Sequence, residues 1–473
     1  MKDITEFTAT RIVGHIADRE LSARDVCQAY LDRIEQFNPV INAVCTPNPR
    51  ALDDAIDVDR RLAAGLAPRA LEGVPFLVKD NLETKGLRTT FGSRLMQDYV
   101  PAEDSACVER MRQAGAVLLG KTNTPEFAHD VNTSNFLFGT TRNPWNLTVS
   151  AGGSSGGSGA AVAAGFAPLA IGTDFGGSVR IPASFNGIVG IRPAPGRVPV
   201  YPTDFGWDTL VPHVVGPMAG NVRDAALMLD VMAGQDSRDP MSLVEPGRSL
   251  ANLADDALGL EGRRIAFCSD LGGLAKVDEE VSALARQAAF SFAALGCHVE
   301  EACFDASDLL DIIAGTRGFG MVARYAERYE QHKGLMTPVL KNQIEAALRL
   351  DLPTMLSAEK LRTLYWRRLA TFMDKYDYII TPTCAAPPFS LGEPEPSDRP
   401  APSRLHDVAL LTYAFSVVGL PVVALPCGVT ASGLPVGIQL AASRQREDLA
   451  LQAAYGYEAV HPECFGRPAI KLP

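Results

Sequence analysis

Short apolar runs alternate with longer helical patterns along most of this chain, and this alternation limits the fold more than any other feature. Strands that alternate with helices predict an α/β architecture built from layers. The strand-like runs are GVPFLVKD (73–80), the segment after Gly115, FAPLAIGTD (166–174), RRIAFCSD (263–270), YDYIITPT (376–383) and VVALPCGV (422–429). The helical patterns are SARDVCQAYLDRIEQF (22–37), DSACVERMRQ (104–113), SSGGSGAAVAAG (154–165), NVRDAALMLDVMAG (221–234), DEEVSALARQAAFSFAALG (278–296) and EDLALQAAYGYEA (447–459).

Several of these helices carry recognisable end signals. Ser22 followed by Asp25 resembles a capping box. Asn221 with Asp224 predicts a second helix start, and Gly234 predicts where that helix stops. Gly296 should end the helix that begins near residue 278.

Composition excludes some classes of function. The chain has 473 residues and a net charge of -11, which argues against nonspecific binding to nucleic acid or to an anionic membrane. The start, MKDITEF, lacks the apolar core of a signal peptide, and no apolar run is long enough to span a bilayer. Nine scattered cysteines, none in a CxxC pair, predict free thiols rather than disulfides or a zinc site. We therefore expect a cytoplasmic protein.

The segment AGGSSGGSGAAVAAG (151–165) allows three interpretations: a flexible linker, a phosphate-binding loop or part of an active site. A linker is disfavoured because NPW precedes the segment and a dense apolar run follows it. A phosphate loop is disfavoured because neither GxxxxGK[ST] nor GxGxxG in a strand–turn–helix frame is present. A second small-residue element, GTDFGGSVRIPA (172–183), follows closely. Together the two elements favour a serine nucleophile surrounded by backbone N–H donors.

Such a serine needs a base, and two candidates remain open on the residues alone. His129 is the only histidine near the glycine-rich region. Lys79 ends the apolar run GVPFLV, where burial could keep an amine neutral and basic, although a surface lysine is an equally good interpretation. If the run is a strand, the neighbouring Asp80 should point to its opposite face.

At this point the chain resembles the amidase signature family. The resemblance is carried by GVPFLVKDN, by FGTTRNPWNLTVSAGGSSGGSGAAVAAG with GTDFGGSVRIPASFNGIVGIRP, and by the later GPMAGNVRDAALML, DYIITPT and GLPVVALPCGV…GLPVGIQL. It is strongest over 73–234, returns over 376–458, and is weak between about 259 and 370. The spacings of 75 residues from Lys79 to Ser154 and 24 from Ser154 to Ser178 agree with the family's pattern.

The resemblance implies a role for each of these residues. Ser178 would be the nucleophile, Ser154 a bridging serine after a cis peptide bond, and Lys79 the base. The N–H groups of Phe175, Gly176, Gly177 and Ser178 would form the oxyanion hole. Asp174 and Arg180 would make a supporting ion pair, for which a purely structural role is the favoured interpretation, and Ser155 would help to hold Lys79. The implied fold is a large mixed β-sheet between helical layers.

Two departures bear on specificity rather than on chemistry. Phe175 stands where many members have threonine, and Gly220 where many have arginine. By motif position Glu126, Phe127 and His129 fall where the family lines its acyl pocket, with Phe127 the best supported and ordinary packing the alternative. The motifs hold no unpaired arginine or lysine that could clamp a carboxylate, so an uncharged acyl group is expected.

The sequence therefore predicts a hydrolase of carbon–nitrogen bonds in small amides, extending to esters or carbamates. The alternatives are the glutaminase subunit of a tRNA-dependent amidotransferase and a scaffold protein without catalysis, the latter opposed by the intact Lys79, Ser154 and Ser178. We expect no metal or organic cofactor, a small-molecule amide as the partner, no nucleic acid and no membrane; a homodimer is allowed. One domain (1–473) is expected, with a helical N-terminal segment (about 1–60), a largely helical insertion (about 245–370) and a long surface loop (387–403).

Overall fold

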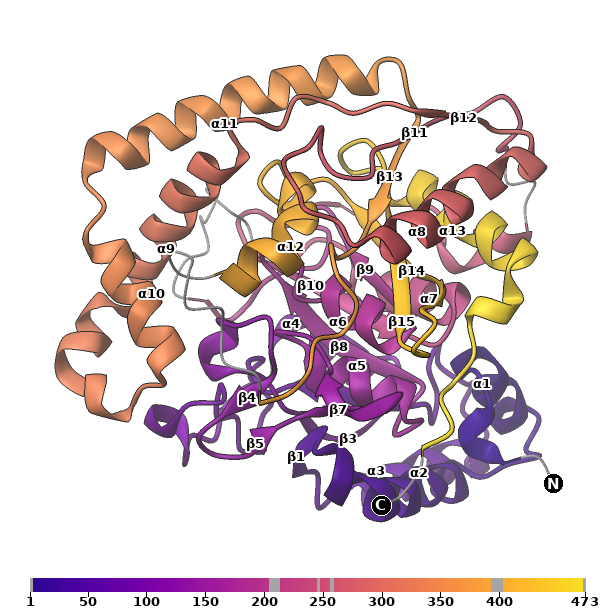
Figure 1. Ribbon diagram of the computed structural model, residues 1–473. Helices are drawn as coiled ribbons and strands as arrows, with labels where there is room; N and C mark the ends of the chain where they lie inside the picture. Colours follow the sequence, from indigo (N-terminus) through magenta and orange to yellow (C-terminus); the bar gives the residue numbers. More distant parts are fainter. Residues whose placement is uncertain (1–2, 204–212, 245–246, 256–258, 393–402, 471–473) are drawn as a thin grey trace.

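A computed structural model of the protein describes residues 3–203, 213–244, 247–255, 259–392 and 403–470. Within them an eleven-stranded mixed sheet runs through the molecule in the order β1-β3-β2-β8-β10-β9-β14-β15-β13-β11-β12 (Figure 1). Its strands are β1 (Val44–Pro47), β2 (Pro75–Lys79), β3 (Val117–Thr122), β8 (Leu169–Asp174), β9 (Val189–Arg192), β10 (Val214–Ala219), β11 (Arg264–Phe267), β12 (His298–Glu301), β13 (Tyr378–Pro382), β14 (Val422–Val429) and β15 (Pro435–Ala441). The predicted α/β fold with a large mixed sheet is confirmed.

Two short hairpins complete the strand inventory of the described chain. They pair β4 (Ser134–Asn135) with β5 (Gly139–Thr140) and β6 (Arg142–Asn143) with β7 (Asn146–Ser150). Both lie between β3 and the glycine-rich segment, so they lead the chain from the sheet into the candidate site.

The centre of the sheet explains why its strands read as continuous apolar runs. β2 pairs in parallel with both β3 and β8, and β8 pairs antiparallel with β10. Every residue of β2 and of β8 is buried. A strand covered on both faces carries apolar side chains without alternation, so polar residues at its end are exceptional. Lys79 and Asp174 are the last residues of these two strands.

The helices fall into groups, several of which pack on the sheet. They are α1 (Ala9–Ala17), α2 (Ala23–Ile41), α3 (Ala51–Ala63), α4 (Ala106–Gln113), α5 (Gly156–Ala163), α6 (Arg180–Asn186), α7 (Val222–Met232), α8 (Glu279–Ser291), α9 (Leu309–His332), α10 (Pro338–Leu348), α11 (Leu352–Met373), α12 (Ser403–Ser416) and α13 (Glu447–Val460). Helix α6 contacts both α5 and α12, whereas α7 contacts α4 and α13. The resulting helical layers agree with the predicted arrangement.

The predicted helix ends are present. The Ser22 side chain accepts a hydrogen bond from the N–H of Asp25, and the Asn221 side chain accepts one from Asp224. Gly296 adopts the left-handed conformation that closes the helical segment beginning at α8. α2 continues past Phe37 to Ile41, with Pro39 inside its last turn.

Helices α9, α10 and α11 form a separate group at the upper left of Figure 1, far from the N-terminal helices α1–α3 at the lower right. α9 packs against both α10 and α11. The segment around 245–370 is not only helical, because β11 and β12 extend one edge of the sheet. The assignment of the whole chain to one domain stays a prediction.

One cysteine expectation is wrong. Cys268 and Cys303 form a disulfide, while the seven other cysteines are free. The bond joins the end of β11 to the segment that leads into α9. The two residues lie 35 positions apart, and no spacing rule marks such a pair. Because disulfides are typical of oxidising compartments, the cytoplasmic location stays a prediction.

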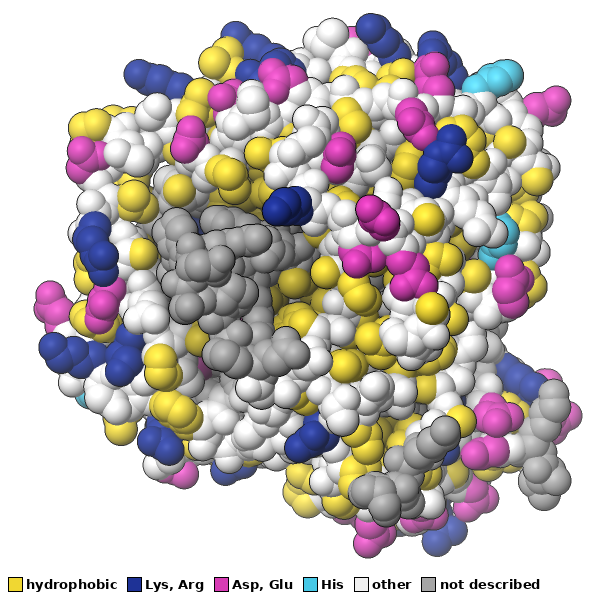
Figure 2. Space-filling model, viewed as in Figure 1, with side chains coloured by type: hydrophobic (Ala, Val, Ile, Leu, Met, Phe, Trp, Pro, Cys, Tyr) yellow, Lys and Arg dark blue, Asp and Glu magenta, His cyan; other side chains and the backbone are white. Residues whose placement is uncertain are grey.

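Two further observations concern the molecule's surroundings. No helix within the described ranges is long and apolar enough to cross a bilayer. On the face shown in Figure 2, acidic and basic side chains are interspersed rather than gathered by sign. The described part of this face therefore presents no continuous cationic surface of the kind that binds nucleic acid.

Candidate active site

Lys79 is completely buried at the end of β2. Its Nζ lies 2.7 Å from Ser154 Oγ and 2.9 Å from Thr173 Oγ1. Burial lowers the pKa of Lys79 well below its ordinary value, although the carboxylate of Asp174 opposes this shift. The Asp80 carboxylate accepts from the Thr90 N–H instead, so the neighbour in sequence points away from Lys79 as predicted. The surface interpretation of Lys79 is therefore wrong.

Ser154 follows a cis peptide bond from Gly153, as the resemblance implied. A side chain at position 153 would come within 2.6 Å of the Asp130 carbonyl oxygen, which explains the glycine there. The Ser154 backbone carbonyl accepts from Thr124 Oγ1 at 3.1 Å. These contacts fix the serine whose hydroxyl meets Lys79.

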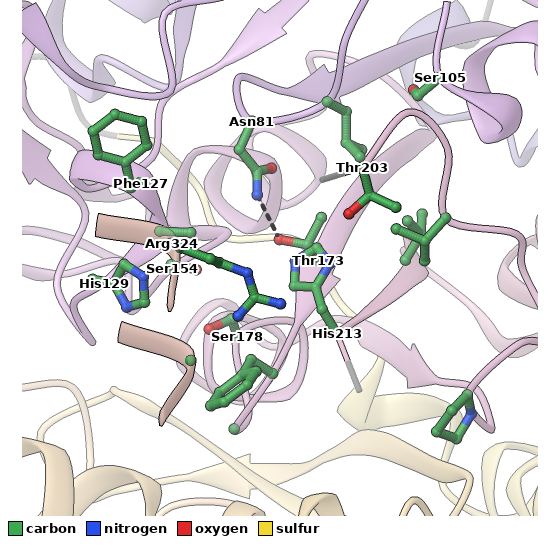
Figure 3. Close-up of a pocket in the computed structure, with 18 of the residues that line it drawn as sticks. Asn81, Ser105, Phe127, His129, Ser154, Thr173, Ser178, Thr203, His213 and Arg324 are labelled. Atoms are coloured by element: carbon green, nitrogen blue, oxygen red, sulfur yellow. Dashed lines mark hydrogen bonds between the residues drawn. The ribbon is translucent and has the colours of Figure 1, made fainter. Parts of the chain in front are cut away.

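Ser155 acts on Lys79 through an intermediate residue rather than by contact. Its Oγ donates to the carbonyl oxygen of Thr173 and accepts from the Thr173 N–H, both at 3.2 Å. The hydroxyl of Thr173 in turn accepts from Lys79 and from the side chain of Asn81, as Figure 3 shows for the latter. Sequence reasoning missed Thr173. Its signal was a hydroxyl residue inside a buried strand, one position before Asp174.

Ser178 lies on the turn between β8 and α6, and its side chain lines a cavity. The Ser178 carbonyl oxygen accepts from the N–H of Ser155 at 3.0 Å, which ties the two serine segments together. In the described chain no hydrogen bond joins the hydroxyls of Ser154 and Ser178. The bridge expected at Ser154 is therefore formed toward Lys79 but not yet toward Ser178.

The turn that carries Ser178 is held by a buried charge cluster. Asp174 pairs with Arg180, as predicted, and also with Arg192, which was not. Burial would raise the pKa of Asp174, but the two guanidinium groups hold it well below its usual range. All three side chains are fully buried, so this is an internal ion cluster rather than a surface pair.

The backbone N–H groups of this turn divide into two kinds. Those of Phe175, Gly176 and Ser178 make no hydrogen bond within the described chain. That of Gly177 differs from expectation, because it donates to Asp174 Oδ1 at 2.8 Å. Three donors of the four expected are thus available to a ligand. An unbonded N–H beside a cavity can donate a hydrogen bond to a ligand.

Close packing explains the two glycines of the turn. A Cβ at Gly176 would lie 2.1 Å from the Tyr413 ring, and one at Gly177 would lie 2.2 Å from Thr412 Oγ1. Gly177 also has a φ of +126°, which other residues rarely adopt. α12 therefore presses directly on the turn and fixes the direction of its N–H groups.

The cavity beside Ser178 has a volume of about 990 Å³ and is also lined by Ser154, Phe127 and His129. Phe127 contacts the ring of Tyr325 from α9. Glu126 does not line the cavity; its carboxylate accepts from Ser93 Oγ and from the Thr337 N–H. Of the three residues expected at an acyl pocket, two therefore reach the cavity and Glu126 serves packing.

The cavity contains arginines that the sequence motifs did not reveal. Arg317 and Arg324 of α9 both line it, so the cavity holds cationic side chains that the expectation of an uncharged acyl group, based on the motifs alone, did not consider. His213 lines it as well, and sequence reasoning also missed this residue. Burial, together with nearby cations, lowers the pKa of His213 to about 3 and that of His129 well below its ordinary value.

The described residues contain no group of three or more histidine, cysteine or acidic side chains that could hold a metal ion. The expectation of no cofactor stays a prediction. Of the predicted loop 387–403, residues 393–402 lie outside the described residues. Within the described part of this loop, Ser390 forms an isolated antiparallel β-bridge with Val149.

Comparisons with known proteins match most of the chain. A family model described as Amidase matches residues 25–451. An acylamidase of Rhodococcus erythropolis is 36% identical over 470 residues, covering 98% of each chain. A glutamyl-tRNA(Gln) amidotransferase subunit of Synechococcus sp. (strain CC9902) is 37% identical over 484 residues, covering 96% of each. The crystal structure of a bacterial aryl acylamidase superposes with a TM-score of 0.91 at 30% identity and 99% coverage of each chain.

Proposed function

Since the chain belongs to the amidase signature family of hydrolases, we propose that it cleaves the carbon–nitrogen bond of small amides, and of related esters or carbamates, through an acyl-enzyme on Ser178. The observation that carries the proposal is the buried contact of 2.7 Å between Lys79 Nζ and Ser154 Oγ. A fully buried lysine whose Nζ contacts hydroxyl groups rather than a carboxylate is the kind of amine that serves as a base near neutral pH.

The first half-reaction follows from this contact. Neutral Lys79 accepts the proton of Ser154 while Ser154 accepts that of Ser178. The Ser178 oxygen attacks the substrate carbonyl carbon, and the negative charge that forms on the carbonyl oxygen is met by the N–H groups of Phe175, Gly176 and Ser178. Each such donor is typically worth about 2.7 to 4 kcal/mol in the transition state.

The second half-reaction returns the proton and regenerates the serine. When the carbon–nitrogen bond breaks, the proton held by Lys79 passes through Ser154 to the leaving amine. Water then attacks the ester on Ser178 and gives up a proton through Ser154 to Lys79. That proton returns to the Ser178 oxygen as its bond to the acyl carbon breaks and the carboxylic acid leaves. We assign Asp174, Arg180 and Arg192 a positioning role, because they hold the turn and do not face the cavity.

A partner-free assay tests the proposal. The purified chain, with no other protein, should release 4-nitroaniline from 4-nitroacetanilide, followed by absorbance. Ser178→Ala should abolish release, whereas Ser432→Ala, at an exposed loop serine, should not. Release that survives Ser178→Ala would overturn the assignment of the nucleophile.

A second candidate is the glutaminase subunit of a tRNA-dependent amidotransferase, favoured by the 37% identity with the Synechococcus protein. Phe175 and the segment VVGPMAG differ from what that subunit usually shows, so we rank it second. A chain that is inactive on anilides alone, but releases ammonia from glutamine once partner proteins are added, would favour this candidate.

A further inference from the structure

We propose that the cavity selects amides that carry a carboxylate, with Arg317 and Arg324 of α9 as the groups that bind it. This inference rests on the proposed function, because it concerns the substrate of the same site. It replaces the uncharged acyl group expected from the motifs, which hold no suitable cation.

Arg317 makes its hydrogen bonds only to neutral groups within the described chain. Its guanidinium donates to Tyr413 Oη at 2.8 Å, to Gln343 Oε1 at 2.5 Å and to His129 Nδ1 at 3.4 Å. The side chain is half-buried and lines the cavity. A guanidinium remains charged at all physiological pH values, and a charge withdrawn from water favours an anionic partner.

Because Arg317 donates all of these hydrogen bonds, the wall of the cavity around Arg317 and His129 presents mainly hydrogen-bond donors. Because Tyr413 Oη and His129 Nδ1 both accept from Arg317, the protons left on the hydroxyl and on imidazole Nε2 are available to other groups. His129 is neutral, since burial and the nearby arginines lower its pKa well below the ordinary value. Gln343 Nε2 is already used by the His129 carbonyl oxygen at 3.0 Å. A group that only accepts hydrogen bonds, as a carboxylate does, complements such a wall.

Arg324 reinforces the positive potential of the same wall. It lies seven residues after Arg317, two turns further along the same face of α9. In Figure 3 its guanidinium extends toward the centre of the cavity, between the labelled rings of His129 and His213. Its charge contributes to the lowered pKa of both rings, as expected of a guanidinium that lines the same cavity.

The acidic side chains of the cavity have other partners or lie on another side. Glu103 contacts Tyr201 Oη, and Asp239 accepts from the N–H of Val200 and of Met241. Both belong with the segments around Ser105 and Thr203, which Figure 3 places opposite Phe127 and His129. Asp130 Oδ1 accepts from the N–H of Val131, and Glu83 lines the cavity beside Leu82. On its α9 side the described cavity thus carries three arginines, Arg317, Arg324 and Arg328, against one lining carboxylate, that of Asp130.

Binding to an inactive variant tests the proposal without requiring turnover. Calorimetry on Ser178→Ala would compare N-succinyl-4-nitroaniline with its methyl ester, and 4-acetamidobenzoate with its methyl ester. The first pair places the charge on the acyl half and the second on the amine half. In at least one pair we expect the acid to bind about tenfold tighter or more, as charge-assisted hydrogen bonds provide.

Further variants attribute this preference to residues. In the Ser178→Ala background, Arg317→Gln and Arg324→Gln should each weaken the acid by about tenfold and the ester by less than about twofold. Arg317→Lys, which keeps the charge and loses the planar fork, should retain part of the preference. Lys333→Gln removes a positive charge from the exposed end of α9 and should leave the preference unchanged. Unchanged melting temperatures exclude misfolding as the cause.

The proposal is overturned if neither acid binds more tightly than its ester, or if the preference survives both arginine variants. Failure of the proposed function looks different: the wild-type chain would hydrolyse neither acids nor esters, while the binding comparison could still be made.

Discussion

The turn around Ser178 and the helices α9 and α11 line the same cavity, yet they differ in almost every physical respect. The turn consists largely of small residues and presents its backbone N–H groups. Its two glycines pack closely against Tyr413 and Thr412. The helices contribute long charged side chains, and some of their large apolar residues, such as Leu352 and Leu356, remain exposed. Reactivity demands fixed positions, whereas selectivity requires only charge and shape. We therefore assign chemistry to the first region and substrate choice to the second.

The largest expected effect is the loss of activity when the nucleophile is removed from the turn around Ser178. Ser178→Ala should lower kcat/KM for 4-nitroacetanilide by about 10⁴-fold or more, as loss of a nucleophile does in other serine hydrolases. The melting temperature should stay within a few degrees, because this side chain makes no hydrogen bond in the described chain. Normal turnover by the variant would mean that the nucleophile lies elsewhere.

Lys79 gives the second largest effect and a pH signature. Because burial lowers its pKa, the neutral amine exists at lower pH than for an exposed lysine, and kcat/KM should rise with pH through that lowered pKa and then level off. Lys79→Met should remove this limb and reduce amide turnover by about 10²- to 10⁴-fold. Esters should lose less, because an alkoxide leaving group needs the returned proton less than an amine does. A variant that keeps the limb would shift the role to His129.

The contrast between the regions also appears in what the sequence could predict. The strands β2 and β8 and the helix caps at Ser22 and Asn221 follow from local patterns, whereas the close approach of Lys79 to Ser154 was implied by the resemblance to the amidase signature family. Arg317 and Arg324 could not be assigned, because a helical pattern does not say which face meets a cavity formed by distant segments.

The remaining errors have a similar cause. Arg192 joins Asp174 from another strand, and Cys268 joins Cys303 across 35 residues. Both are tertiary contacts without a local signal. The Gly177 N–H was assigned to the oxyanion hole from the resemblance, which does not show that Asp174 already binds this group in the present chain.

The disulfide belongs to only one of the two regions, since it holds the segment before α9 and not the turn around Ser178. Replacing Cys268 and Cys303 with alanine should lower the free energy of unfolding by about 2 to 4 kcal/mol. Turnover of neutral anilides should stay near the wild-type value. Cys464→Ala, at a free half-buried cysteine, is the matched control and should change little. Equal stability of the double variant and the wild type in denaturant titrations would contradict the bond.

The smallest expected effect compares one glycine from each region. Gly177→Ala should cost about 1 to 3 kcal/mol of stability, because the new methyl group meets Thr412 and the positive φ is strained. Gly334, between α9 and α10, has no atom near the corresponding position, so Gly334→Ala should stay within about 0.5 kcal/mol. Denaturant titrations measure both, and equal effects would contradict the difference in packing.

The most direct test of the account is the labelling of the protein by a small neutral fluorophosphonate, located by mass spectrometry of peptides. The account predicts one label, on Ser178, formed faster as pH rises in the wild type and in Lys333→Gln. In Lys79→Met the labelling should be slowed by about 10²-fold or more at neutral pH. A label on another residue, or wild-type labelling rates in Lys79→Met, would contradict the claim that Lys79 activates Ser178.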